Sequence, residues 1–377
     1  MRRLPVTGNW IWQRAAWPHF TWDASALMGV LGRARLAQGQ ALGTARMLEG
    51  ELGLEAWSAV LVADGVTTSA IEGETLDPRA VRSSVARHLG LPAAGLPAPS
   101  RTVEGLVDVL LDATRHHDLP LTRARLMRWH AALFPTGRSG LHDVRAGQLR
   151  GKAPMQVISG RLGREQVHFE APPRGRLLTG LSAFLRWYAS PPRGLDGLLR
   201  AGVAHLWFLT LHPFEDGNGR IARALTDMAL AQDERAAVRT WSLSSRILAE
   251  RDAYYALLEQ TQRGGLDVTP WLSWFLEQVE EAASGAHVVA GRTVLKARFW
   301  LRHSVETLGP RQVKALNRLL DAGPGGFDGG LTARKYAGMN HCSRATATRE
   351  LADLVARGCL VPNGKGGRSA AYELNLP

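Results

Sequence analysis

Apolar residues recur at helical spacing, three or four positions apart, along most of this chain. The segment 201–211 is almost wholly apolar and Pro213 follows it, which predicts a buried helix that ends before the proline. The first hundred residues are also mostly helical in pattern. After them, the predicted helices are Glu104–Arg115, Leu121–Phe134, Leu177–Tyr188, Leu195–Leu211, Ile221–Leu230, Ser244–Gln262 and Asp267–Ala283.

Two places break the helical pattern with short strands. The first is Met155–Ser159 and Gln166–Phe169, which flank a Gly-containing turn and predict a hairpin. The second is Leu360–Val361 and Ala371–Leu374, which flank a basic, Gly-rich loop. Helices are predicted before this second pair over Arg311–Leu320, Thr332–Gly338 and Ser343–Arg357. Three helices and a two-stranded wing are typical of a winged helix-turn-helix.

A Pro-rich segment and a change of pattern divide the chain into three parts. The Pro-rich segment 91–100 marks one boundary, and the change of pattern near residue 290 marks another. We therefore expect a helical extension over residues 1–100, a core over 101–285 and a winged helix-turn-helix over 291–377. An aromatic cluster opens the extension, and we expect it to pack against the body of the protein, with a ligand cage as the alternative: Trp10, Trp12, Trp17, Phe20 and Trp22.

Composition indicates an ordinary globular protein. Of its 377 residues, 45% are hydrophobic and 21% are charged, which excludes a largely disordered chain. No apolar run reaches the length of a membrane span, so we expect no membrane contact. The only cysteines, Cys342 and Cys359, have no zinc-type partners nearby. We expect a reduced, soluble, cytoplasmic protein.

Positive charge is concentrated at the C-terminal end. Net charge is +12, and residues 291–377 carry 14 Lys and Arg against 6 Asp and Glu. A local excess of this kind favours an anionic partner, either DNA or an acidic protein surface, with a merely solvated basic surface as the alternative. The residues that we expect to bind such a partner are Arg344, Arg349, Lys365 and Arg368.

The run His212–Arg223, with the sequence HPFEDGNGRIAR, carries the clearest chemistry. Gly217 and Gly219 allow the backbone to approach a ligand closely before a new helix begins near Arg220. Free amides at the start of that helix form an anion site. Arg220 and Arg223 lie three residues apart, so both project from the first helical turn.

Two further side chains in this run complete a reaction centre. Asp216 at the apex of the loop is a hard oxygen ligand suited to Mg²⁺ on a polyphosphate. His212 at the entrance of the loop can accept a proton near neutral pH. A base, a metal ligand and an anion cradle within twelve residues point to phosphoryl or nucleotidyl transfer.

At every fixed position this run matches the signature of the Fic family, His-Pro-Phe-x-(Asp/Glu)-Gly-Asn-Gly-Arg-x-x-Arg. The resemblance extends over about 101–285, where the predicted hairpin takes the place of the family's flap. The segments before and after it resemble the helical extension and the winged helix of some bacterial Fic proteins. The resemblance implies a mainly α-helical fold with a short hairpin flap.

Family chemistry follows residue by residue as an implication of this resemblance. Fic proteins typically transfer AMP from ATP to a Ser, Thr or Tyr hydroxyl of a target protein. His212 would be the general base, Asp216 would hold Mg²⁺, Phe214 would be a buried wedge, and the flap near Ile158–Val167 would align the target by strand addition. The implied nucleotide contacts are Gly217, Asn218 and Gly219 in the anion hole, Arg220 and Arg223 on the β- and γ-phosphates, and Tyr254 and Tyr255 near adenine, these two with a core role as an equal alternative.

Many Fic proteins also carry an inhibitory helix with the pattern (Ser/Thr)-x-x-x-Glu-(Gly/Asn), whose Glu pairs with the second motif arginine. Thr68–Gly73 and Ser100–Gly105 both match it. We choose Glu72 as the inhibitory residue, because its surroundings resemble the family more closely and lie in the N-terminal extension. Glu104 follows the Pro-rich loop and is expected to open a core helix.

Two alternatives to an adenylyltransferase stay open. The same loop can hydrolyse AMP-protein, with a Glu placed like Glu72 orienting a water molecule. A nucleotide sensor that regulates transcription through the winged helix is the other, although an intact His212 and Asp216 argue against it. The resemblance leaves the target protein, the nucleotide beyond ATP and the oligomeric state unassigned, although relatives often form homodimers.

Overall fold

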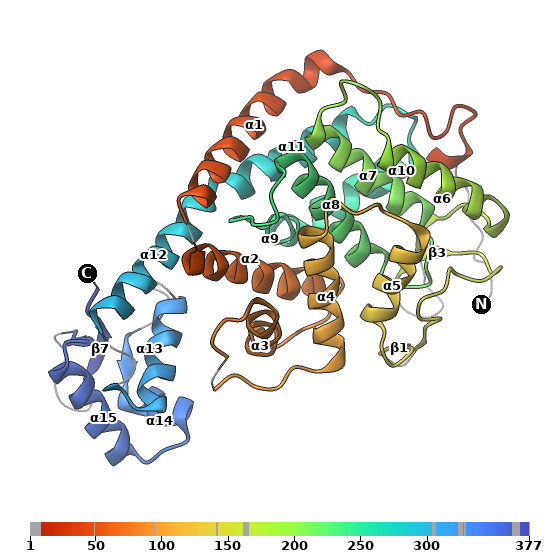
Figure 1. The fold of residues 1–377 in the computed structure, drawn as a ribbon. Coiled ribbons are helices and arrows are strands. Elements are labelled where there is room, and N and C mark those ends of the chain that lie inside the picture. Colours follow the sequence, from red (N-terminus) through yellow and green to blue (C-terminus); the bar gives the residue numbers. More distant parts are fainter. Residues whose placement is uncertain are drawn as a thin grey trace. The chain divides into compact units, whose positions relative to one another are not determined.

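The computed structural model describes residues 9–48, 50–93, 95–140, 142–160, 166–303, 307–322, 327, 329–363 and 370–376 and is mainly α-helical (Figure 1). It divides into two compact units, residues 1–49 with 53–287 and residues 50–52 with 288–377. Residues 1–100 and 101–285, which the sequence separates, therefore lie in one compact unit.

The first unit contains the helices and hairpins up to residue 284. Its elements are η1 (Ile11–Gln13), α1 (Ala24–Arg46), α2 (Gly50–Ile71), α3 (Pro78–Leu89), α4 (Arg101–Arg115), α5 (Arg123–Leu133), β1 (Arg138–Ser139), β2 (His142–Asp143), β3 (Gln156–Ser159), β4 (Gln166–Glu170), α6 (Arg174–Ala189), α7 (Gly197–Leu211), α8 (Asn218–Glu234), α9 (Leu243–Ala249), α10 (Arg251–Arg263) and α11 (Thr269–Ser284).

Helix α7 lies at the centre of this unit. Asp196 caps it by accepting hydrogen bonds from the amides of Leu198 and Leu199, and every residue from Leu198 to Leu211 except Arg200 is buried. A helix that is apolar on all sides can only be stable inside a core. Helix α8 packs on α7, and α1 lies along α11 (Figure 1). The two helices on either side of the His212–Arg223 loop are thus held on a rigid base.

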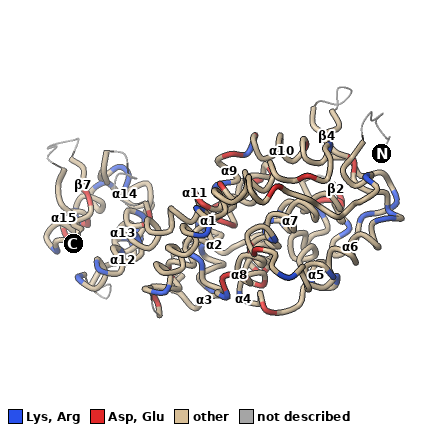
Figure 2. The backbone as a smooth tube through the Cα atoms, turned by 90° about the horizontal axis from the view of Figure 1, so that it is seen from above, with Lys and Arg blue, Asp and Glu red and all other residues tan. Residues whose placement is uncertain are grey.

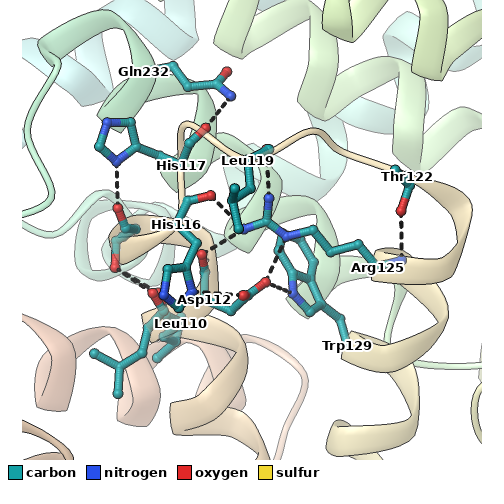
Figure 3. A network of polar contacts seen from close by, with 11 residues as sticks. Leu110, Asp112, His116, His117, Leu119, Thr122, Arg125, Trp129 and Gln232 are labelled. Atoms are coloured by element: carbon teal, nitrogen blue, oxygen red, sulfur yellow. Dashed lines mark hydrogen bonds and ion pairs between the residues drawn. The ribbon is translucent and has the colours of Figure 1, made fainter.

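A buried arginine fixes the connection between α4 and α5 (Figure 3). Arg125 Nε donates to Asp112 Oδ2 at 2.7 Å, and its other nitrogens donate to the carbonyls of Asp112, His116 and Leu119 at 2.7–2.9 Å. Trp129 Nε1 donates to the same Asp112 oxygen at 2.6 Å. Because these hydrogen bonds from the Arg125 guanidinium all end on oxygen atoms, the buried charge stabilises the turn rather than opposing folding.

The N-terminal aromatic residues pack against the body of the unit. Trp10 meets Phe169 of β4 edge to face with ring centroids 5.3 Å apart, and Trp12 Nε1 donates to the Glu170 carbonyl at 2.7 Å. Trp17 packs on Trp207 of α7 with centroids 6.3 Å apart. These contacts favour the packing interpretation over a ligand cage.

The structure corrects the single helix that the sequence predicts over Ser244–Gln262. The chain turns at Glu250, whose φ of −108° and ψ of 30° end α9 and start α10. The apolar spacing continues through this turn, with Ile247, Tyr254 and Leu258 all buried, so periodicity alone does not reveal it. Helix α8 also begins at Asn218, two residues before the predicted start.

The second unit combines four helices with a small sheet. Its elements are α12 (Ala286–Arg302), which starts just before the boundary, α13 (Pro310–Ala322), β5 (Leu331–Thr332), α14 (Ala333–Asn340), α15 (Arg344–Ala356), β6 (Leu360–Pro362) and β7 (Ala371–Leu374). The strands are antiparallel in the order β5-β7-β6.

This unit contains each helix and strand predicted for 311–377, and α12 and β5 are additional. Its core includes Phe299, Leu316, Tyr336 and Leu351. The predicted wing residues Lys365 and Arg368 lie outside the described residues. Within the described part of the chain, no helix combines the length and the hydropathy that crossing a membrane requires.

Candidate active site

The loop between α7 and α8 takes its shape from three residues. His212 ends α7 with a left-handed φ of 46°, and Pro213 follows it. Gly217 caps α8 with φ of 74°. A Cβ atom at Gly217 would lie 2.8 Å from the Phe134 ring, so this turn requires a glycine.

Phe214 and Asn218 hold this loop closed. The Phe214 side chain is fully buried and stacks on His130 with ring centroids 4.2 Å apart. The Asn218 side chain accepts from the Phe214 amide at 3.0 Å and donates to the Phe214 carbonyl at 2.9 Å. These two bonds fix the Asn218 side chain on the Phe214 backbone, so the Asn218 backbone amide at the start of α8 is the group suited to an anion.

His212 is prepared to act as a base. Its Nδ1 lies 3.3 Å from the Leu209 carbonyl, an acceptor that requires the proton to be on Nδ1. Arg150 Nε donates to the His212 carbonyl at 2.8 Å and fixes the backbone. Burial, together with Arg150, lowers the pKa of His212 to about 4. The imidazole is therefore neutral at pH 7, with Nε2 unprotonated.

Asp216 is a half-buried carboxylate at the apex of the loop, and its Oδ1 accepts from the Gly217 amide. Among the described residues no group of three or more His, Cys, Asp or Glu side chains could hold a metal. A lone carboxylate fits Mg²⁺, which keeps water and takes substrate phosphate oxygens alongside one or two carboxylates.

The start of α8 lacks part of its hydrogen-bond complement. Arg220 and Arg223 are 4% and 2% exposed. Arg220 Nε and Arg223 Nη1 are buried and have no hydrogen-bond partner among the described residues. Buried donors of this kind are costly when unpaired. Together with the free amides of the first turn of α8, they fit an anion with several oxygens.

A carboxylate from α2 already lies in this cradle. Glu72 Oε1 accepts from Arg223 Nη2 at 2.7 Å, and a Cβ atom at Gly219 would lie only 2.0 Å from the same oxygen. Arg223 also donates from Nε to the Thr68 hydroxyl at 2.6 Å and from Nη2 to the Thr68 carbonyl at 3.0 Å. Although burial opposes it, the Glu72 charge raises the pKa of Arg223 above its usual value.

The end of α2 explains the remaining positions of the Thr68–Gly73 pattern. The amide of Gly73 donates to the Ala70 carbonyl at 3.0 Å, and the amide of Glu74 donates to the Ser69 carbonyl at 2.9 Å. This pair of bonds is a Schellman motif, which needs a left-handed residue at Gly73, where φ is 82°. Glu72 is thus the residue between the end of α2 at Ile71 and the left-handed Gly73, and this motif fixes its position.

The same motif places a second carboxylate that the sequence analysis did not identify. Glu74 Oε2 accepts from Arg220 Nη1 at 3.0 Å. One short segment therefore holds both motif arginines, Glu72 binding Arg223 and Glu74 binding Arg220. The signal in the sequence was the acidic residue directly after Glu72-Gly73, since a Schellman motif turns the chain back towards the helix.

Comparisons with known proteins place this loop within the profile of a known family. The profile of the Fic/DOC family matches residues 120–230, which include the whole loop. Residues 120–230 form a Fic/DOC family domain. The profile of a domain of unknown function, DUF4172, matches residues 10–91, which include the Glu72 segment.

Solved structures agree with this Fic fold. A Fic family protein from Desulfovibrio desulfuricans G20 is 20% identical, with a TM-score of 0.52 over 95% of this chain and 98% of that chain. Fic-1 from C. elegans (18% identity, TM-score 0.48, 71% and 74% covered) and a Fic domain containing signaling protein from Bacteroides thetaiotaomicron (16%, 0.47, 71% and 97%) are more distant. We base only the fold on the first of them.

The two tyrosines that the resemblance implies near adenine differ in their burial. Tyr254 is 1% exposed, and its hydroxyl lies 2.8 Å from His205 Nε2 inside the core. Tyr255 is half-buried and donates to the Ile71 carbonyl at 3.3 Å, beside the Glu72 segment. The burial of Tyr254 favours the core alternative for that residue, whereas Tyr255 borders the site.

The rival Glu104 lies elsewhere. It is in the first turn of α4 and forms an ion pair with Arg87 at the surface of the unit. Within the described residues Glu104 contacts no arginine of the motif, so Glu72 is the pattern glutamate that does.

The described part of the flap is tied to α10. The register of β3 and β4 shifts after Val157, which leaves His168 as a bulge residue. His168 Nδ1 lies 2.6 Å from Glu259 of α10, and its Nε2 lies 2.6 Å from the Ser159 hydroxyl across the hairpin. Of the predicted flap residues, 161–165 lie outside the described ranges.

Proposed function

We propose that this Fic domain protein transfers AMP from ATP to a Ser, Thr or Tyr hydroxyl of a target protein, in the cytoplasm, and that Glu72 holds it inactive. The observation that carries the proposal is that one loop combines a neutral His212 with buried arginine donors at the start of α8 that have no partner among the described residues. This combination suits a reaction in which a hydroxyl loses a proton beside a polyphosphate.

The proposed reaction assigns one task to each group. The target oxygen attacks the α-phosphorus of ATP while its proton passes to Nε2 of His212. The bond from the α-phosphorus to the pyrophosphate oxygen breaks, and pyrophosphate leaves. Amides of Asn218 and Gly219 and the guanidinium groups of Arg220 and Arg223 bind the phosphate oxygens. Asp216 would hold Mg²⁺, which neutralises charge on the leaving pyrophosphate.

Inhibition follows from competition for the same donors. While Glu74 and Glu72 occupy Arg220 Nη1 and Arg223 Nη2, phosphate oxygens cannot bind to these two nitrogens without displacing a carboxylate. The Glu72 carboxylate is itself an anion at the start of a helix, the position that a phosphate would take. The segment thus acts as a substitute ligand.

A second function, hydrolysis of AMP-protein, is favoured by the position of Glu72 directly over the Gly219 backbone. A carboxylate there could orient a water molecule against a bound AMP group. Incubation of the full chain with ATP and Mg²⁺, followed by intact-mass analysis, tests the proposed direction. A mass gain of one AMP that is stronger in Glu72→Gly supports transfer. Loss of AMP from a pre-modified target, abolished in Glu72→Gly, would support hydrolysis instead.

The C-terminal unit carries a separate proposal. Arg344 and Arg349 are exposed on α15, five residues apart, and no carboxylate among the described residues contacts either side chain. We propose that this helix binds DNA or an acidic protein surface. The exposed face of α15 and the local charge excess support this, as does the order of its helices and strands.

A further inference from the structure

A basic pocket lies next to the His212–Arg223 loop, since its lining residue Arg150 donates to the His212 carbonyl. The pocket has a volume of about 690 Å³, and four basic residues line it: Arg145, Arg150, Lys152 and Arg174. The described lining contains no Asp or Glu. The remaining lining residues are Leu149, Gly151, Pro173, Gly175 and Leu178.

Arg150 is the unusual member of this set. It is 2% exposed, and its Nε and Nη2 donate to the carbonyls of His212 and Pro172. No carboxylate among the described residues pairs with it. Burial and the neighbouring Arg174 lower the pKa of Arg150 to about 10. A buried cation without a counter-charge is costly, and an anion bound in the pocket would remove that cost.

The other cations are free to bind a ligand. Lys152 is exposed and Arg174 is half-buried, and neither side chain has a carboxylate partner among the described residues. The Arg145 guanidinium donates to Gln148 and has no carboxylate partner among the described residues. The Glu215 carboxylate lies close to Gly151 of the lining, and it accepts from the Arg145 amide at 3.2 Å.

The first turn of α6 adds to this positive field. Arg174 is the first residue of α6, which has no side-chain cap and no acidic residue in its first turn. The amide of Arg176 donates to the Pro173 carbonyl at 2.8 Å, and the helix dipole adds a partial positive charge at this end of α6. Figure 2 shows Lys and Arg gathered at this end of the unit, between β2 and α6.

We propose that this pocket binds acidic side chains of the target protein, next to the hydroxyl that receives AMP. The proposal rests on the function proposed above, because it is the target that must approach His212. Arg150 touches the His212 backbone directly, and Lys152 lies four residues before the flap strand β3. A target whose acidic residues lie in the pocket would therefore place its neighbouring residues close to the flap and to His212.

Binding can be tested without any catalysis. The probes are two fluorescein-labelled peptides with a single Thr, flanked in one by Asp and Glu and in the other by Asn and Gln. For the full-length protein we expect the acidic peptide to bind about tenfold more tightly, the value of one good charge-assisted hydrogen bond. Arg174→Glu should abolish this difference, and Lys152→Glu should reduce it.

The matched control is Arg186→Glu, since Arg186 is exposed at the far end of the same helix. A Glu at the first residue of α6 suits the helix dipole, so Arg174→Glu should fold. Equal affinities for the two peptides, or equal effects of Arg174→Glu and Arg186→Glu, would overturn the proposal. So would a single-stranded oligonucleotide that displaces the acidic peptide and binds more tightly in an Arg174-dependent way.

Transfer of AMP to the two peptides by the Glu72→Gly protein separates this proposal from the proposed function. If both hold, Arg174→Glu raises the KM for the acidic peptide about tenfold and leaves the KM for ATP unchanged. Charge-dependent binding without any transfer would support the pocket and contradict the adenylyltransferase. Transfer with equal KM values for both peptides would support the enzyme and contradict the pocket.

Discussion

Removal of the Glu72 carboxylate should activate this protein, and the structure sets the size of the effect. Two unit charges about 4 Å apart attract by about 4 kcal/mol at an effective dielectric of 20. Because the side chains of Arg223 and Glu72 are 2% and 27% exposed, the cost of desolvation offsets much of that attraction. A net of about 1.4–2.8 kcal/mol remains, so Glu72→Gly should raise AMP transfer roughly 10- to 100-fold.

Glu74 should contribute less to inhibition than Glu72. Its side chain is 38% exposed, and exposed ion pairs are worth about 0.2–1 kcal/mol after screening by solvent. Glu74→Gln should therefore raise transfer by a factor of about two to five, and added salt should reduce this factor. Because both residues lie on one helix end, the double variant need not show the product of the two effects.

The assay is incorporation of labelled AMP, into the protein itself or into an added target, by the wild type and the variants. Glu104→Gly is the matched control, because its carboxylate pairs with Arg87 and should have no effect on transfer. Arg223→Ala added to Glu72→Gly should restore low activity, since the γ-phosphate then lacks its partner. Activation by Glu104→Gly and not by Glu72→Gly would refute this reasoning.

Three further predictions concern the base, the core and the C-terminal unit. His212→Ala should lower transfer by a factor of roughly 10²–10⁴ while ATP still binds. Because the pKa of His212 is about 4, the rate of transfer by Glu72→Gly should not fall between pH 8 and about pH 6. A fall in rate near the ordinary imidazole pKa of about 6.5 would contradict the assigned geometry. Arg125→Met should destabilise the fold at pH 7 by about 3–5 kcal/mol. Although burial opposes the shift, bonding to Arg125 lowers the pKa of Asp112, so this stabilisation is present above the ordinary carboxyl pKa and is lost as the pH falls. Urea unfolding should therefore show a smaller effect of the substitution at pH 3. Replacement of both exposed arginines of α15 by Ala should reduce the slope of log affinity against log salt for DNA by about two, and absence of DNA retention by the wild type even at low salt would leave only the acidic protein partner.

The reaction loop could be predicted from sequence because its determinants are local. Gly217, Asn218 and Pro213 act on the backbone within a few residues, and helical periodicity located the elements on both sides. Where a determinant is distant, the prediction stopped. Arg150 lies 62 residues from the His212 carbonyl that it binds, and nothing in its neighbours indicates that contact. The turn at Glu250 was missed because buried residues continue across it in phase.

The Glu72 segment shows how a short pattern can be both weak as a signal and physically specific. Two segments fit the pattern, and the sequence alone could rank them only by likeness to relatives. In the fold each fixed position has its own cause: Thr68 accepts from Arg223 through its hydroxyl, Glu72 carries the charge, and Gly73 takes the left-handed conformation that ends the helix. Ser100–Gly105 also matches the pattern, but it lies at the start of a helix, so its glycine does not end a helix as Gly73 does.

Competition at one cradle couples inhibition to nucleotide binding. Suppose that the carboxylates and the phosphate oxygens use the same donors on Arg220 and Arg223. The apparent affinity for ATP is then the intrinsic affinity multiplied by the fraction of molecules in which the Glu72 segment has moved away. Linkage then requires that ATP weaken the hold of Glu72 by the same factor as Glu72 weakens the hold on ATP. The Schellman motif makes this exchange cooperative, because Glu72 and Glu74 lie on one rigid helix end and displacement of one carboxylate moves the other. A partner that binds the end of α2 would therefore release both arginines together, and could activate the enzyme without touching the reaction loop.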